Sequence, residues 1–289
     1  MFFIKNSAKS LPNQPAVLPL KQYFRRPSIY LKLPSGGKYP PNILNMPESG
    51  ELPVYPMTAI DEITSKTPDA LYNGTAMTDI IKSCIPDIID PWLISSVDLD
   101  AILIAIKAAS GGNDLEIEST CPSCSDSSKY GINLLLLLTT LTAANYENTM
   151  EINELHIKFK SLTYKELNQT KISQFEVQRI LAGLESNTNT DDTIRIEKTQ
   201  LAIKSIVELT IALISNSIEY VETPNGKVTD KEFIMDYLTN CDKQSYIAIR
   251  DFNTKLKAEA EIKPLAIKCI KCSHEYSQPF TLNITDFFA

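Results

Sequence analysis

Two Cys-x-x-Cys pairs, separated by about half of the chain, constrain the fold more than any other feature. The first pair is Cys121-Pro122-Ser123-Cys124 and the second is Cys269-Ile270-Lys271-Cys272. Two residues between the cysteines let both sulfur atoms of a pair face one ion from a tight turn, and two such turns complete a tetrahedral shell. The pattern predicts a structural Zn²⁺ site whose ligands are Cys121, Cys124, Cys269 and Cys272.

The two pairs lie unusually far apart, because 145 positions separate Cys124 from Cys269. Ordinary zinc ribbons place roughly 15–20 residues between their pairs, so the spacing predicts a ribbon split by a long insertion. Closing such a loop costs chain entropy, which Zn²⁺ can offset because its apparent binding free energy in small peptides is ~10–16 kcal/mol. Iron in the same thiolate shell, or two unrelated thiol pairs without metal, are the alternatives that the sequence leaves open.

The first part of the chain is rich in proline. Ten of the 17 prolines lie within residues 1–56, which is too many for a helix and predicts an extended arm with a short strand near residues 28–33. The arm also carries aromatic side chains, among them Tyr23 and Phe24, so we expect it to dock on its own domain or on a neighbour. Ser35-Gly36-Gly37-Lys38 lacks the spacing of a phosphate-binding loop and predicts a turn.

Helical periodicity follows the arm and begins near Thr58. Apolar positions within residues 76–85 share one face of a helix that ends at Pro86, and Cys84 on that face is predicted to be a buried core thiol. A second helix is predicted over residues 98–111.

Strand-like alternation enters the first cysteine pair at residues 115–121 and recurs over residues 155–159. His156 lies on the polar face of the second of these strands and is predicted to be a surface histidine. His274 is predicted to be a turn residue beside the second pair.

Residues 163–260 are predicted to be mainly helical, with capping boxes that begin at Thr163 and Thr229 and a long amphipathic helix that includes Ile218. The prediction is therefore an α+β protein with a mainly helical body, an extended arm and a split four-cysteine zinc ribbon. Its parts are an arm at 1–56, an N-terminal helical region at 57–112, a split ribbon at 113–136 and 262–289, and a mainly helical insertion at 137–261.

Catalytic signatures are missing from the sequence. Its two histidines lie outside any nucleophile or metallohydrolase motif. Asp61-Glu62 and Asp98-x-Asp100 fall at predicted helix N-termini, where the helix dipole favours acids, so we interpret them as capping residues. A shell of four thiolates leaves no open coordination position for Lewis-acid chemistry. We therefore predict no catalytic residue, no small-molecule substrate and no cofactor other than the zinc ion.

The net charge of −7 disfavours nucleic acid as a partner, because phosphate contacts need clustered Lys and Arg. The longest apolar runs fall short of the roughly 20 residues of a membrane span. The N-terminus lacks the apolar stretch and cleavage site of a secretory signal, so we expect the chain to fold in a cytosol.

A succession of short motifs is spread over most of the chain. In order they are Leu33-Pro34-Ser35-Gly36-Gly37-Lys38-Tyr39-Pro40, Pro56-Met57-Thr58-Ala59-x-Asp61-Glu62, Pro68-Asp69-Ala70-Leu71-x-x-Gly74, Asp98-x-Asp100, the Cys121/Cys124 pair, Cys269-x-x-Cys272-x-His274-x-Tyr276 and Phe287-Phe288. Together they resemble the T4-like phage baseplate hub subunit and baseplate hub assembly family.

The resemblance implies a non-enzymatic structural or assembly protein of the baseplate hub in a contractile phage tail. It implies other baseplate and tail proteins as partners, and a place in the host cytoplasm during assembly or in the virion tail. One rival is a zinc-ribbon nucleic-acid-binding or transcription-related module, which would need a basic face around the ribbon. Another is a metalloenzyme, which would need a solvent-open metal site.

Overall fold

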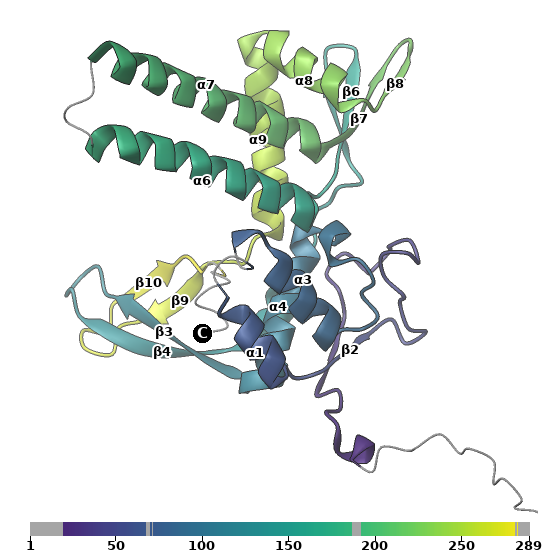
Figure 1. The fold of residues 1–289 in the computed structure, drawn as a ribbon, viewed down its shortest axis with the longest axis vertical. Helices are drawn as coiled ribbons and strands as arrows, with labels where there is room; N and C mark the ends of the chain where they lie inside the picture. The colour runs from purple at the N-terminus through teal and green to yellow at the C-terminus, as the bar shows by residue number, and fades with distance from the viewer. Residues whose placement is uncertain (1–19, 68–69, 71, 187–191, 281, 283–289) are drawn as a thin grey trace, which may run out of the picture.

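The computed structural model describes residues 20–67, 70, 72–186, 192–280 and 282. Among these residues, two separate hydrophobic cores define a base lobe and a head lobe. Figure 1 shows the head lobe above the base lobe, with a ribbon of strands β3, β4, β9 and β10 projecting from the side of the base. The architecture is a mixed α+β fold, as predicted.

The base lobe is built around one buried helix. Its elements are η1 (Lys21–Tyr23), β1 (Ile29–Leu31), β2 (Leu52–Val54), α1 (Ala59–Ser65), α3 (Thr75–Cys84), η2 (Pro91–Leu93), α4 (Ser96–Gly111) and α5 (Leu134–Thr140). Helix α4 has buried residues on every side, including Leu103, Ile104 and Ile106, as expected of a helix that is apolar all round. Cys84, at the end of α3, is fully buried, which confirms its prediction as a core thiol.

The proline-rich segment contributes directly to this core. Strands β1 and β2 pair antiparallel, with Ile29 opposite Val54, and the predicted short strand is confirmed. Leu31, Leu33 and Leu52 are almost completely buried. The described part of the arm after residue 27 therefore docks on its own lobe, whereas residues 1–19 lie outside the described residues.

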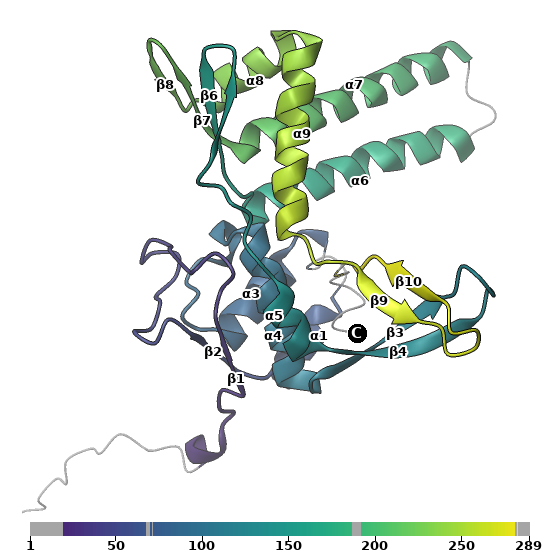
Figure 2. The same cartoon turned by 180° about the vertical axis from the view of Figure 1, so that it is seen from behind.

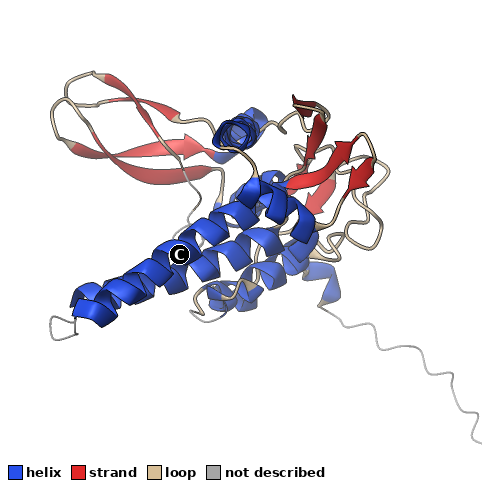
Figure 3. Ribbon diagram, turned by 90° about the horizontal axis from the view of Figure 1, so that it is seen from above, coloured by secondary structure: helices blue, strands red, loops and turns tan. Residues whose placement is uncertain are grey.

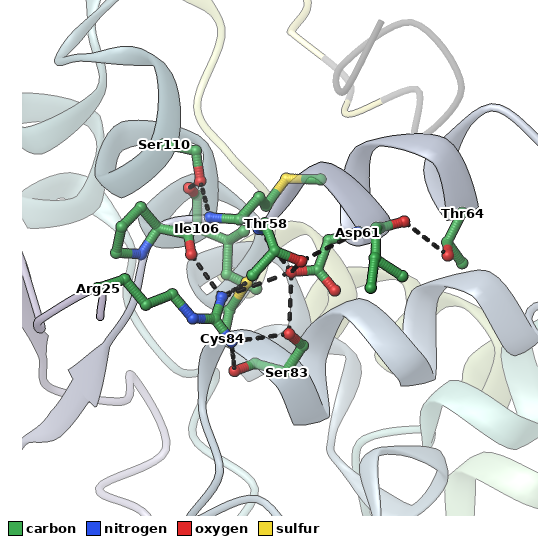
Figure 4. A network of polar contacts seen from close by, with 11 residues as sticks. Arg25, Thr58, Asp61, Thr64, Ser83, Cys84, Ile106 and Ser110 are labelled. Atoms are coloured by element: carbon green, nitrogen blue, oxygen red, sulfur yellow. Dashed lines mark hydrogen bonds and ion pairs between the residues drawn. The ribbon is translucent and has the colours of Figure 1, made fainter. Parts of the chain in front are cut away.

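Arg25 attaches the start of this segment to two helices (Figure 4). Its guanidinium group donates hydrogen bonds to the carbonyl oxygens of Pro56 and Ser83, at 2.5 and 2.7 Å, and lies 3.4 Å from the Asp61 carboxylate. Asp61 also completes a capping box with Thr58 at the start of α1, which confirms the predicted capping role.

Asp98 has a different role from the one predicted. It lies in the first turn of α4, but its buried carboxylate accepts hydrogen bonds from the Ser35 amide and hydroxyl, at 2.9 and 2.5 Å, and from the Tyr39 hydroxyl at 2.5 Å. Gly36 and Gly37, with φ angles of 78° and 68°, form the predicted turn. The carboxylate therefore fixes a loop of the proline-rich segment onto α4, because a buried charge needs several donors.

The head lobe combines an antiparallel sheet with four helices, and its elements alternate along the chain. They are β5 (Thr149–Ile152), β6 (Leu155–Phe159), α6 (Tyr164–Ser186), α7 (Asp192–Ser217), β7 (Ile218–Thr223), β8 (Gly226–Val228), α8 (Lys231–Asn240) and α9 (Lys243–Ala260). The sheet order is β5-β6-β7-β8. Ile157 and Phe159 point into the core, while His156 on the opposite face is exposed, as predicted.

Two local predictions in the head lobe are wrong. Ile218 begins strand β7 and does not continue the long helix, because its segment pairs with both β6 and β8. The N-cap of α8 is Asp230, whose carboxylate accepts from the Glu232 amide at 2.8 Å, so the helix begins one residue later than a box at Thr229 would place it. The capping box of Thr163 with Glu166 is confirmed.

Helices α6 and α7 form a long antiparallel hairpin that extends away from both lobes, as Figures 1 and 3 show. Their residue spans correspond to roughly 35–39 Å each. Within the described part of the chain, no helix combines the length and hydropathy that crossing a membrane would require.

Candidate metal centre

The predicted split ribbon consists of two β-hairpins from distant parts of the chain. Strands β3 (Asp114–Thr120) and β4 (Ser127–Asn133) form the first hairpin, and β9 (Leu265–Lys268) and β10 (Glu275–Gln278) form the second. Figure 2 shows the two hairpins side by side at the edge of the base lobe. Ser119 of β3 and Tyr276 of β10 join them, because their hydroxyl oxygens lie 2.7 Å apart.

Each cysteine pair occupies the turn of one hairpin, and the two turns have the same backbone hydrogen bonds. The amide of Cys121 donates to the Asp126 carbonyl, and the amide of Cys269 donates to the His274 carbonyl, both at 2.9 Å. Ser125 and Ser273, each four residues after the first cysteine of its pair, adopt left-handed φ angles of 57° and 61°. The two knuckles are therefore turns of the same backbone conformation.

The four sulfur atoms converge at one point. All lie within 4.8 Å of one another, and the Cys121–Cys272 and Cys124–Cys269 sulfur pairs are each 3.7 Å apart. A tetrahedral site with metal–sulfur bonds of about 2.3 Å separates its sulfur atoms by about 3.8 Å. A disulfide would need about 2.05 Å, and all four thiols are free. The donor set and its spacing therefore fit a four-thiolate metal ion.

Burial of the four ligands is uneven. Cys121 and Cys269, the first cysteine of each pair, are almost fully buried, whereas Cys124 is half-buried and Cys272 is exposed. The site is thus closed on its inner side and sits near the surface on its outer side, as in a structural zinc site that terminates a ribbon.

Electrostatics oppose the simultaneous ionisation of these thiols without a cation. The Cys272 amide donates to the Cys269 thiolate and lowers the pKa of Cys269 to about 6. The Asp126 amide acts to lower the pKa of Cys124, but burial and the neighbouring thiols outweigh it and raise that pKa to about 12. A bound divalent cation would instead favour the ionised form of all four thiols, because metal binding releases the thiol protons.

Two contacts outside the sulfur cluster also connect the hairpins. The Lys271 ammonium lies 3.2 Å from the Asp126 carboxylate, so the second knuckle contacts the first directly. The buried Ser119 hydroxyl also donates to the side-chain oxygen of Gln278. Sequence reasoning missed these residues because single Ser, Asp and Lys residues give no local signal of a partner 145 or more positions away.

The other predicted positions lie outside this cluster. Among the described residues, the metal-ligating side chains that converge on one point are those of the four cysteines. His274 lies in the second turn with its ring stacked 6.2 Å from that of Tyr276, as a turn residue. His156 lies on the head sheet, 3.5 Å from the Glu151 carboxylate.

Comparison with known proteins identifies one family. A family model described as "T4 bacteriophage base plate protein" matches residues 27–289, a span that contains both cysteine knuckles. The searches against curated proteins and against solved structures give no match.

Proposed function

We infer the role of this chain from its family, because the match over residues 27–289 shows that it belongs to the T4 bacteriophage base plate proteins. We propose that it is a structural or assembly protein of the baseplate hub in a contractile phage tail. This match is the observation that carries the proposal, since it spans the base lobe, the head lobe and both halves of the ribbon.

We further propose that Cys121, Cys124, Cys269 and Cys272 bind one structural Zn²⁺ ion. The sulfur spacing of 3.7 Å and the matched turns support this assignment. The ion would join the two ends of the segment that carries the head lobe and hold both ends against the base. Four thiolates fill the coordination shell, so the ion would supply rigidity and no Lewis-acid catalysis. We accordingly propose a non-enzymatic role.

The proposed partners are other baseplate and tail proteins, met in the host cytoplasm during assembly or retained in the virion baseplate. Exposed apolar side chains support a docking role, because Ile60 and Ile63 project from α1 with about 70% of their surface exposed. A rigid body with apolar contact points suits a component that is built into a larger assembly.

The ribbon surface disfavours the rival nucleic-acid module. Asp114, Glu116 and Glu118 occupy alternate positions of β3 and are all exposed, so they line one face of the first hairpin. Lys129 is close to Glu116, at 3.4 Å, and neutralises only part of this charge. An acidic face repels phosphates, whereas a nucleic-acid-binding ribbon needs a basic one.

The proposal is tested by a mass-spectrometric inventory of purified virions and of tail assembly intermediates, combined with metal analysis of the isolated chain. We expect the chain in one of these assemblies and one zinc per chain. Its absence from both, together with normal tail assembly when its gene is disrupted, would contradict the hub role. A metal-free chain with intact ribbon hairpins would contradict the zinc assignment alone.

A further inference from the structure

The α6–α7 hairpin exposes far more apolar surface than a two-helix projection can bury by itself. Ile180 on α6 and Ile196, Leu201, Ile203, Ile206 and Val207 on α7 are each 45–59% exposed. None of these six belongs to the core of either lobe within the described chain. Isolated helices are marginal in water and derive most of their stability from tertiary packing. At about 100° per residue, Ile196, Ile203 and Ile206 face away from Leu201, so a partner on the Leu201 side of α7 would cover only part of this apolar surface.

A trough of about 840 Å³ runs along one side of the hairpin, between α6, α7 and α8. Its apolar lining includes Val177 from α6, Ile211 from α7 and Met235 from α8. Glu176, Glu208 and Lys204 also line it, so the trough combines an apolar lining with two carboxylates and one ammonium group. Such a groove accepts an amphipathic helix whose apolar side chains are flanked by cations.

Helix α7 itself carries the features that this trough would accept. Ser205, Glu208 and Ala212 line the trough, and Lys198 and Leu201 continue the same side of the helix by steps of three and four residues. Leu201 is 58% exposed and Lys198 is also exposed. On this side of α7, the N-terminal half therefore presents a cation, Lys198, and a large apolar residue, Leu201. The C-terminal half presents a small residue, Ser205, and an anion, Glu208.

Two copies of α7 would satisfy each other if the side that carries Lys198, Leu201 and Glu208 faced the same side of the partner and the helices ran antiparallel. The two-fold axis would then be level with position 203, whose own side chain points away from the contact. Lys198 of one copy would then oppose Glu208 of the other, and Leu201 would oppose Ser205, a large side chain against a small one. Glu208 lies 3.8 Å from Lys204 on its own helix, but both side chains are mostly exposed, and such surface pairs contribute little. Glu208 can therefore accept the incoming cation.

We propose that the occupant of this trough is a second copy of the chain, and that two chains dimerise through their α6–α7 hairpins. The hairpins form an antiparallel four-helix bundle with the same patch on both copies, which is the arrangement that two-fold symmetry requires. The inference is independent of the zinc site, and either can fail without the other.

The first test is the mass of the full-length, zinc-loaded chain by light scattering and analytical ultracentrifugation. We expect twice the monomer mass of 32.3 kDa. Leu201→Asp should weaken dimerisation about 100-fold or more, because it replaces the large apolar side chain of both Leu201–Ser205 contacts with a charge. Ile60→Asp, on the exposed face of α1, is the matched control and should leave the dimer intact. Circular dichroism and zinc content verify that both variants fold.

A charge-reversal experiment tests the register. Lys198→Glu and Glu208→Lys should each weaken the homodimer about 10-fold or more, since each creates two like-charged contacts. An equimolar mixture of the two variants should restore dimers, because both contacts of the mixed pair then join opposite charges. A monomeric wild-type chain at about 0.1 mM, which would also result if a helix of another protein covers the trough, contradicts the proposal. Failure of the mixture to dimerise contradicts the register.

Discussion

The base lobe and the ribbon both hold together segments that lie far apart in the chain, but they do so by different means. In the base lobe, the side chains of Leu31, Leu52 and Val54 are buried against α4 and its neighbours. In the ribbon, β4 and β10 have no buried residue, β3 buries only Ser119 and β9 buries only Ile267. Apolar burial fixes the first region, whereas we propose that a metal ion bound by the four thiolates fixes the second.

The most severe disruption should come from the ribbon. Cys121→Ser should release the metal and abolish protection of the β3 and β4 amides in hydrogen exchange, because the apparent binding free energy of a structural zinc is ~10 kcal/mol or more. The base lobe, which has its own core, should keep its protection. Cys241→Ser is the matched control, since Cys241 is half-buried outside the cluster and should not affect zinc content. Unchanged protection of the β3 and β4 amides in the Cys121 variant would contradict the proposal that a metal ion stabilises the ribbon.

The reciprocal change is made in the base lobe. Leu52→Ala removes a completely buried side chain and should lower the free energy of unfolding by about 2–5 kcal/mol while zinc binding is retained. Denaturant unfolding and metal analysis measure the two effects separately. Leu136→Ala, at an exposed position of α5, should cost far less. Loss of zinc in the Leu52 variant would show that the two regions are coupled.

A smaller effect is expected where the lobes meet. Asp100 lines a cavity of about 210 Å³ with Lys257 of α9 and Glu261, the C-cap residue of that helix, and burial raises the pKa of Asp100 to about 6. The folded state thus favours the neutral carboxyl, whose stabilising contribution is complete below about pH 4 and is lost as the pH rises through 6.

Asp100→Asn should therefore raise the free energy of unfolding at about pH 8 by up to ~3 kcal/mol and leave it nearly unchanged at about pH 4. Unfolding curves at the two pH values measure the difference. An equal effect at both would mean that titration of Asp100 is not its cause.

The smallest effect is expected at the surface of the ribbon. Lys271→Ala removes the ion pair with Asp126, but Lys271 is exposed and Asp126 is only half-buried, so the midpoint of thermal unfolding should shift by no more than about 2 °C. Zinc content should be unchanged. If this variant loses zinc, the link between the knuckles depends on more than the four sulfur atoms.

The sequence was most informative where a short motif determines its own geometry. A Cys-x-x-Cys turn is specified by local spacing, so both knuckles and their convergence could be predicted without knowledge of the rest of the fold. Alternation likewise located β6, because Ile157 and Phe159 point inward at every second position. The metal itself is not fixed by this geometry, because iron accepts the same four thiolates.

Prediction failed where local patterns are ambiguous or contacts are distant. Ile218 follows an apolar run that fits a helix, and only pairing with β6 and β8 makes its segment a strand. Asp98 stands where a capping acid would stand, yet its partners Ser35 and Tyr39 come from a loop about 60 positions earlier. The Arg25–Asp61 contact is equally non-local. No propensity or periodicity signals such pairs.

X-ray absorption spectroscopy of the purified chain at the zinc edge tests the central claim most directly. If one ion joins the two knuckles, the spectrum will show four sulfur neighbours at about 2.3 Å in the wild type. A shell that contains nitrogen or oxygen, or the absence of stoichiometric metal from the folded chain, would contradict it.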